Sequence, residues 1–220
     1  MTTATVLMTE FVTHDVKRFI LSKPDGFAYV PGQGVLVALD ARDLEEDPHP
    51  FTPTSLTDDR VLEFTIKGYP KHKGLTAKLH RLRPGDTVAL GEVFGTIQYR
   101  KPGVFIAGGA GITPFVAIFR SLAAKGKLKG NALLFSNKTR ADVILERELR
   151  HDLGAGAVFT LTRDKAPGYE SGRIDRAFLK RHIKNFKQAF YVCGPHEFVD
   201  AVTAALADLG AGAKNIVIEE

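Results

Sequence analysis

The hydrophobic pattern of this chain changes near residue 100, and this change limits the possible folds more than any single motif does. Before it, apolar residues occur in short segments separated by Pro, Gly and Asp, which is typical of antiparallel strands. After it, short apolar runs alternate with amphipathic helical segments, which is typical of a parallel sheet covered by helices. We therefore expect two domains, an antiparallel β-barrel over residues 1–100 and an α/β doubly wound parallel sheet over residues 101–220.

The expected elements follow from the same patterns. Barrel strands are predicted at residues 4–12, 16–22, 34–40, 61–69 and 87–93. Five sheet strands are predicted at residues 104–107, 131–136, 157–162, 189–194 and 215–219, with helices following 112 and over 141–153, 175–184 and 195–210. Thr113 is a candidate N-cap of the first of these helices, with Pro114 at its first position.

Composition excludes several classes of protein. Hydrophobic residues make up 44% and charged residues 25% of the 220 residues, which predicts a folded chain rather than a disordered one. No apolar run approaches the roughly eighteen residues of a membrane span, and the N-terminus has no secretion signal, so we expect a cytoplasmic protein without membrane contact. Cys193 is the only cysteine, which excludes a four-thiolate cluster. The seven histidines show no metal-ligand spacing, so no metal site is expected.

The net charge of +5 favours acidic partners or phosphates. The same charge makes a nucleic-acid module an alternative, but the lysines are dispersed and are not interleaved with stacking aromatics, so no nucleic-acid partner is expected.

The segment GGAGITP joins a predicted strand to a predicted helix. Its glycines, including Gly109 and Gly111, allow a ligand to approach the backbone, and the free N–H groups of the helix start favour an anion such as a pyrophosphate. The pattern lacks the third glycine of the dinucleotide fingerprint. A tight strand-to-helix turn without a ligand is therefore the alternative.

Polar side chains follow the next two strands of the predicted sheet. Ser136, Asn137 and Lys138 end one strand, and Thr162 and Arg163 end the next. These cations and hydroxyls suit the 2′-phosphate of a nucleotide, and a solvated basic rim is the alternative for each side chain taken singly. Cys193 ends a central strand, where a ligand of such a sheet rests, and its alternative is a small buried side chain.

Two segments of the first half also suggest ligand binding. Gly74 and Thr76 lie at the start of a short predicted helix, which favours an anion. The segment HPFTPTS, residues 49–55, offers an aromatic ring and hydroxyls that an isoalloxazine ring can stack on and bond to. An edge strand with a rigid turn is its alternative.

Together, these segments resemble the ferredoxin-NADP reductase superfamily, in particular the flavodoxin or ferredoxin reductases without an iron-sulfur domain. The resemblance covers nearly the whole chain, and GGAGITPF with YVCGP is its most specific part. It implies a flavin-binding barrel followed by an NAD(P)-binding domain, and a bound FAD, with FMN as the alternative.

The resemblance implies a set of flavin contacts. Phe51 would pack on the flavin, Thr52 would reach flavin N5 as a catalytic residue, and His49 would replace the family's arginine at the pyrophosphate. Ile66 and Lys67 would lie beside the ribityl chain. The remaining residues resemble the flavin pyrophosphate loop and are Gly74, Leu75 and Thr76.

The nucleotide contacts are implied in the same way. Gly109, Gly111 and Thr113 would form the nicotinamide and pyrophosphate loop. Thr162 and Arg163 resemble the pair that holds the 2′-phosphate in NADPH-using members. The remaining residues are Arg173, which would assist this pair, and Cys193 and Gly194, which would lie near the nicotinamide, Cys193 as a second catalytic residue.

The function implied is that of an NAD(P)H-dependent flavin oxidoreductase. NAD(P)H, with NADPH favoured over NADH, would reduce FAD, and electrons would pass to an acidic carrier such as flavodoxin or ferredoxin. A reductase that uses free flavin as its substrate is one alternative. A flavin-binding electron-relay subunit without nucleotide turnover is the other.

Overall fold

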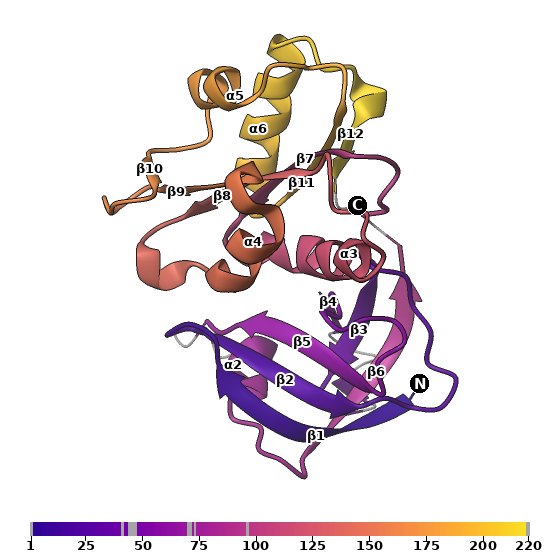
Figure 1. Ribbon diagram of the computed structural model, residues 1–220. Coiled ribbons are helices and arrows are strands. Elements are labelled where there is room, and N and C mark those ends of the chain that lie inside the picture. The colour runs from indigo at the N-terminus through magenta and orange to yellow at the C-terminus, as the bar shows by residue number, and fades with distance from the viewer. Residues whose placement is uncertain are drawn as a thin grey trace.

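We describe a computed structural model of the chain, which covers residues 2–40, 42–43, 48–69, 72, 74–95 and 97–218. Its strands form two six-stranded sheets, one from each half of the chain. Figure 1 shows the first sheet below and the second above. This arrangement confirms the predicted fold class, whereas the boundary at residue 100 remains a prediction.

The first sheet is antiparallel and closes into a barrel. Its strands are β1 (Thr2–Phe11), β2 (Val16–Ser22), β3 (Gly34–Ala38), β4 (His49–Phe51), β5 (Val61–Lys67) and β6 (Thr87–Phe94), in the order β4-β3-β6-β1-β2-β5. An isolated bridge between Pro53 and Phe64 joins the two edges. The short helix α2 (Leu75–Leu79) contributes Leu75 and Leu79 to the barrel core. Closure leaves no exposed sheet edge at β5.

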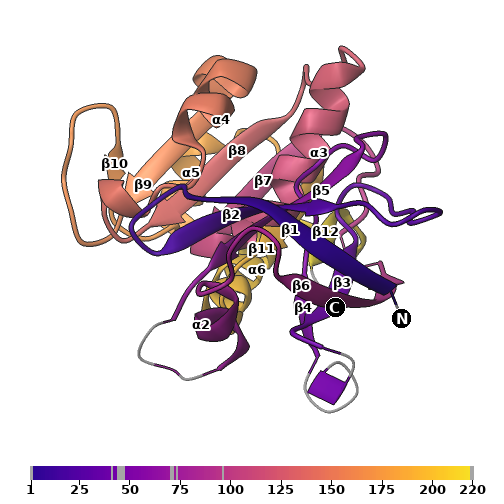
Figure 2. The ribbon, with the colours of Figure 1, turned by 90° about the horizontal axis from the view of Figure 1, so that it is seen from below.

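The second sheet is parallel. Its strands are β7 (Gly103–Gly108), β8 (Ala132–Asn137), β9 (Ala157–Leu161), β10 (Glu170–Ser171), β11 (Ala189–Cys193) and β12 (Ile216–Ile218), in the order β10-β9-β8-β7-β11-β12. Figure 2, viewed from the barrel side, shows β9, β8 and β7 side by side behind the barrel. Because the chain winds outward from β7 in both directions, the point where it reverses lies between β7 and β11, where ligands of such sheets bind.

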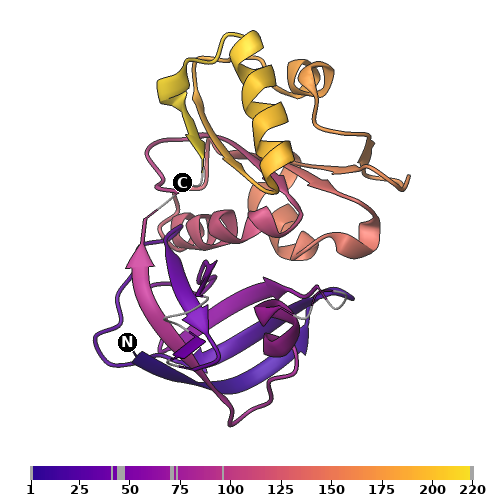
Figure 3. The same cartoon turned by 180° about the vertical axis from the view of Figure 1, so that it is seen from behind.

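Helices cover both faces of this sheet. They are α3 (Thr113–Ala124), α4 (Glu146–Leu153), α5 (Arg176–His182) and α6 (His196–Asp208). One core cluster joins α3 to the sheet and includes Val16 and Ile97 from the first half of the chain. A second joins α5 and α6 to the opposite face, which Figure 3 shows from behind. The face under α3 therefore looks toward the barrel.

Aromatic stacking ties the connection between the two halves to the sheet. Tyr99, Phe105 and Tyr191 form a stack with ring centroids 4.4 Å apart for Phe105 and Tyr191 and 5.9 Å apart for Tyr99 and Tyr191. The Tyr191 hydroxyl accepts hydrogen bonds from the backbone N–H groups of Arg100 and Lys101. The path of the chain out of the barrel is thereby held against β11.

The structure differs from the expected elements at four places. The helix predicted over 141–153 is broken into a 3-10 turn (Arg140–Asp142) and α4, because Leu145 adopts a left-handed conformation with φ of 51°. The strand β10 was not expected. Thr113 does not cap α3, since its hydroxyl donates to the Ala110 carbonyl instead. Residues 49–51 form an edge strand, which was the alternative for that segment.

Within the part of the chain that the structure describes, none of the helices combines the length and the apolar character needed to cross a membrane.

Candidate functional site

A cleft of about 660 Å³ lies between the barrel and the carboxyl ends of the parallel strands. This volume is in the range of small-molecule sites. The predicted site residues that line it are Phe51, Thr52, Ile66, Lys67, Thr76, Gly109, Gly111, Thr113, Thr162, Cys193 and Gly194. Segments that are far apart in the sequence, from both halves of the chain, thus meet at one surface.

The barrel side of the cleft is formed by side chains held in fixed positions. Thr52 is 7% exposed and follows β4, and Lys67 ends β5. The Lys67 ammonium lies 2.8 Å from the carboxylate of Asp15. Burial raises the pKa of Asp15, but the hydrogen bond and the charge of Lys67 outweigh this effect and hold it below its usual value. Lys67 therefore presents a positioned cation to the cleft.

The sheet side combines a glycine loop with polar side chains at the strand ends, such as Ser136, Lys138 and Thr162. Gly109 follows β7 with φ of +55°, a conformation that favours glycine. A Cβ on Gly111 would lie 2.5 Å from the backbone carbon and oxygen of Cys193, so the loop after β7 packs directly on the end of β11. This backbone contact by itself explains the glycine at position 111, and it fixes the loop of residues 109–111 along the cleft.

Asn137, which the sequence analysis named only as one of the polar residues at a strand end, has a distinctive environment in the structure. It ends β8 and lines the cleft, it is 5% exposed, and neither atom of its carboxamide has a hydrogen-bond partner in the structure. Leaving such groups unsatisfied costs about 1–3 kcal/mol. Asn131, six residues earlier, is also buried, but its carboxamide is bonded to Gly103, Leu128 and Tyr99. Burial of an asparagine therefore does not by itself indicate missing hydrogen bonds, and only the structure distinguishes the two residues.

Other residues of the cleft were also not named as site residues. Tyr69 follows β5 and is 47% exposed, and the GYP segment after a predicted strand was a signal for it. Phe198 packs within about 3 Å of the ideal Cβ positions of Gly108 and Gly194, and its helical periodicity indicated only a core residue. The remaining ones are Pro50, Thr65, Gly108, Ala110, Asp142 and Pro195, and the cleft also includes Ser136 and Lys138, which the sequence analysis named at the end of their strand.

Five predicted site residues do not line this cleft. Leu75 is 6% exposed and its side chain lies in the barrel core, so only its backbone faces a ligand on this side. Gly74, before α2, has open space where a Cβ would point. Arg163 and Arg173 are at the solvent-facing rim near β9, and His49 is half-buried in β4. Their roles remain predictions.

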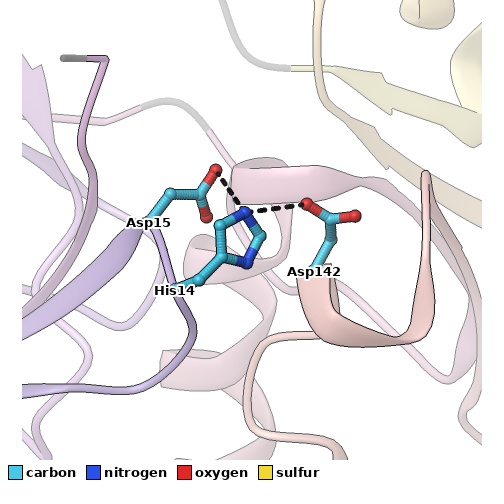
Figure 4. A group of neighbouring side chains, drawn as sticks. All are labelled: His14, Asp15 and Asp142. Atoms are coloured by element: carbon cyan, nitrogen blue, oxygen red, sulfur yellow. Dashed lines mark ion pairs between the residues drawn. The ribbon is translucent and has the colours of Figure 1, made fainter.

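A cluster of His14, Asp15 and Asp142 joins the two halves beside the cleft (Figure 4). The His14 Nε2 atom lies 3.6 Å from Asp15 and 3.8 Å from Asp142. Among the residues that the structure describes, this is the group of three that could hold a metal ion. Both carboxylates are already engaged, Asp15 by Lys67 and Asp142 by the Thr139 hydroxyl at 2.6 Å. The cluster therefore acts first as a polar link between the halves.

The cleft fits two polar cofactors that approach from opposite sides. The barrel offers an aromatic ring, a hydroxyl and a cation at Phe51, Thr52 and Lys67. The sheet offers the glycine loop and the unsatisfied carboxamide of Asn137. A flat ring system with a phosphate chain satisfies both sets of groups.

Comparisons with known proteins agree with this division. Residues 1–111 match the family described as FAD-binding domain, and residues 105–204 match the family described as oxidoreductase NAD-binding domain. The NADH-cytochrome b5 reductase 2 of Mycosarcoma maydis is 28% identical over 90% of this chain and 63% of its own length. The naphthalene 1,2-dioxygenase system ferredoxin–NAD(P)(+) reductase component of Pseudomonas putida is 27% identical over 96% of this chain and 66% of its own length.

A solved structure shows the same fold. The ferredoxin NADP+ reductase of Neisseria gonorrhoeae, with bound FAD and NADP, superposes with a TM-score of 0.86 at 20% identity and covers 99% of this chain and 97% of that one. The chain spans about two thirds of the length of the two reductases above.

The fold and the cleft together define a two-domain protein with an FAD-binding barrel and an NAD-binding sheet. The chain belongs to the FAD-binding domain family, with an oxidoreductase NAD-binding domain after it, and its fold is that of a ferredoxin NADP+ reductase.

Proposed function

We propose that this protein is an NAD(P)H-dependent flavoprotein oxidoreductase that transfers electrons from the coenzyme, through FAD, to a protein acceptor. The observation that carries the proposal is the single cleft to which both halves contribute, with Thr52 and Lys67 on one side and the loop of residues 109–111 on the other. FAD held there would supply the redox chemistry, since it could take two electrons and one proton as a hydride from the nicotinamide and release the electrons one at a time.

The protein's own residues bind and orient. Phe51 packs against the flavin ring, the Thr52 hydroxyl donates a hydrogen bond near N5, and Lys67 balances negative charge beside the ribityl chain. The backbone of residues 109–111 and the start of α3 hold the coenzyme's pyrophosphate, with Cys193 beside the nicotinamide. Because such a transfer needs close contact and little water rather than an acid or a base, these positioning roles account for the catalysis.

The experiment that tests the proposal uses the purified protein. The visible absorption bands of oxidised flavin are expected, and they are expected to bleach when NADPH or NADH is added without oxygen. A colourless protein that takes up no added FAD and responds to neither coenzyme would refute the proposal.

The acceptor is proposed to be an acidic one-electron carrier. The net charge of +5 favours steered docking of such a partner. Flavodoxin or ferredoxin is the proposed class, and a cytochrome b5-type haem protein is the alternative favoured by the name of the Mycosarcoma relative. Reduction of each carrier by the FAD-loaded protein, measured at low and high salt, distinguishes them.

NADPH is the proposed coenzyme because Lys138 lines the cleft and Arg140 and Arg163 lie on the adjacent rim. NADH is the alternative, since the carboxylate of Asp164 lies on the same rim, 3.5 Å from the backbone nitrogen of Arg140. The ratio of kcat/KM for the two coenzymes decides between them.

A reductase that uses free flavin is the second candidate. It is favoured by His49, which stands where the family has arginine and does not line the cleft. Retention of flavin through gel filtration supports a bound cofactor, and complete loss supports the free-flavin reaction.

A further inference from the structure

Arg120 of α3 bridges the barrel and the nucleotide-binding sheet. One of its terminal nitrogens donates to Glu63 of β5 at 2.6 Å and to the Thr54 carbonyl at 2.7 Å. Its other two nitrogens donate to both carboxylate oxygens of Glu148 in α4, at 2.5 and 2.8 Å. A planar guanidinium is suited to this because it can bond two carboxylates in fixed directions at once.

The bridge is partly removed from water. The Arg120 side chain is 19% exposed and that of Glu63 is 11% exposed. Burial lowers the pKa of Arg120, but the hydrogen bonds and charges of Glu148 and Glu63 outweigh it and raise the pKa, so the group is charged at any ordinary pH. Low exposure strengthens each bond relative to a surface ion pair.

The groups that Arg120 joins lie next to the proposed cofactor contacts. On the barrel, Thr54 is two residues after Thr52, and its hydroxyl and N–H both bond to Glu63 at 2.7 Å. On the helix, Arg120 is seven residues after Thr113, which is two turns and about 10.5 Å along the same face. Arg120 thus connects the segment that carries Thr52 to the helix that begins at Thr113.

We infer that Arg120 is a positioning residue that sets the distance and orientation between the flavin on the barrel and the nicotinamide on the sheet. The expected effect on the reaction rests on the proposed function, whereas the bridge between Arg120, Glu63 and Glu148 is observed independently of it. A displacement of about 1 Å between reacting groups can slow a reaction by about a hundredfold. The rest of the contact between the halves includes apolar side chains such as Val16 and Ile97, which are less directional.

The test compares Arg120→Met, which keeps the length of the side chain, with Arg150→Met as a matched control. Arg150 also bonds to a glutamate, Glu146 at 2.7 Å, but both residues belong to the sheet half. In FAD-loaded protein, Arg120→Met is expected to slow flavin reduction at saturating coenzyme at least tenfold, while the dissociation constants of FAD and coenzyme change less than about threefold. Arg120→Lys is expected to restore part of the rate, and Arg150→Met to leave it unchanged.

A second readout does not depend on activity. Residual dipolar couplings of backbone amides report the relative orientation of barrel and sheet, and Arg120→Met is expected to change that orientation whereas Arg150→Met is not. Arg120→Met leaves the buried Glu63 carboxylate with the Arg18 guanidinium 3.8 Å away as its ion-pair partner. An additional Glu63→Gln change removes this charge, so a defect that persists in the double variant is not due to it.

The outcomes separate this inference from the proposed function. Wild-type reduction rate and unchanged orientation in Arg120→Met would overturn the inference, as would equal slowing in Arg150→Met. If neither coenzyme reduces the wild-type protein, the proposed function fails, and the couplings still decide whether Arg120 sets the orientation.

Discussion

The two halves of the molecule contribute to the cleft in different ways. The barrel presents side chains such as Phe51, Thr52 and Lys67, whereas the sheet adds, besides polar side chains, a glycine loop whose backbone packs on the backbone of Cys193 at Gly111. Side chains can be replaced by others of similar shape, but backbone packed on backbone cannot accept an added atom. The sheet side should therefore be the less tolerant one, and the predictions below test this difference.

The largest effect is expected for Gly111→Ala. The new methyl group would lie 2.5 Å from the backbone of Cys193, which cannot move without distorting β11. We expect a loss of about 3 kcal/mol or more in the free energy of unfolding, together with loss of coenzyme binding. Denaturant unfolding and coenzyme titration measure the two effects.

Gly74→Ala is the matched control on the barrel side, because nothing lies within 4 Å of its ideal Cβ position. Its unfolding free energy should change by less than about 1 kcal/mol. Equal unfolding free energies of Gly111→Ala and Gly74→Ala would contradict the proposal that the sheet side tolerates substitution less than the barrel side.

Asn137→Leu tests a polar side chain on the sheet side of the cleft. Because its carboxamide is buried without partners, the replacement should raise the unfolding free energy of the ligand-free protein by about 1 kcal/mol. The same change should weaken coenzyme binding about tenfold, since a ligand loses its hydrogen bonds. Chemical unfolding and calorimetric titration give the two numbers.

Asn131→Leu is its control, because this asparagine is bonded to three partners. It should lower stability by about 1–3 kcal/mol. Destabilisation of Asn137→Leu to the same extent, with unaltered coenzyme affinity, would show that Asn137 has a structural role.

Arg163→Ala tests whether the exposed rim next to the cleft contributes to the choice of coenzyme. If Arg163 contacts the 2′-phosphate, its removal should raise the KM for NADPH about tenfold, because one charge-assisted contact is lost, and should leave the KM for NADH nearly unchanged. Steady-state kinetics with both coenzymes measures this. Equal effects on NADPH and NADH would refute the assignment.

The smallest effect is expected on the barrel side at alkaline pH. Burial, together with nearby carboxylates, raises the pKa of Tyr29 to about 12, although its hydrogen bond with Ser55 acts in the opposite direction. The folded state therefore favours neutral Tyr29, and this contribution to stability is present below about pH 10 and is lost as the pH rises toward 12. Unfolding of Tyr29→Phe, compared with wild type, should depend less on pH in this window, and identical pH dependence would contradict the assignment.

Local sequence patterns predicted the two sheets and most of the elements well. Apolar alternation and turn residues located the long strands, and the GGAGITP segment located the loop at the cleft. Local patterns could not predict the break at Leu145, since a leucine rarely adopts a positive φ and carries no signal for it. Nor could they predict strand β10, which has only two residues.

Sequence reasoning predicted site residues only where they belong to a recognisable motif. The pairing of Arg120 with Glu63 joins residues 57 positions apart, and no spacing rule relates them. Likewise, Asn131 and Asn137 are alike in sequence, and only their surroundings show that one has partners and the other has none. Long-range contacts of this kind depend on the packing of two domains rather than on local composition.

Hydrogen–deuterium exchange with each ligand tests most directly whether the two halves hold different cofactors. FAD is expected to slow amide exchange at residues 51–52, 65–67 and 74–76, and the oxidised coenzyme to slow it at 108–113 and 193–194 of the FAD-loaded protein. Protection of the same half by both ligands, or of neither half, would contradict the account.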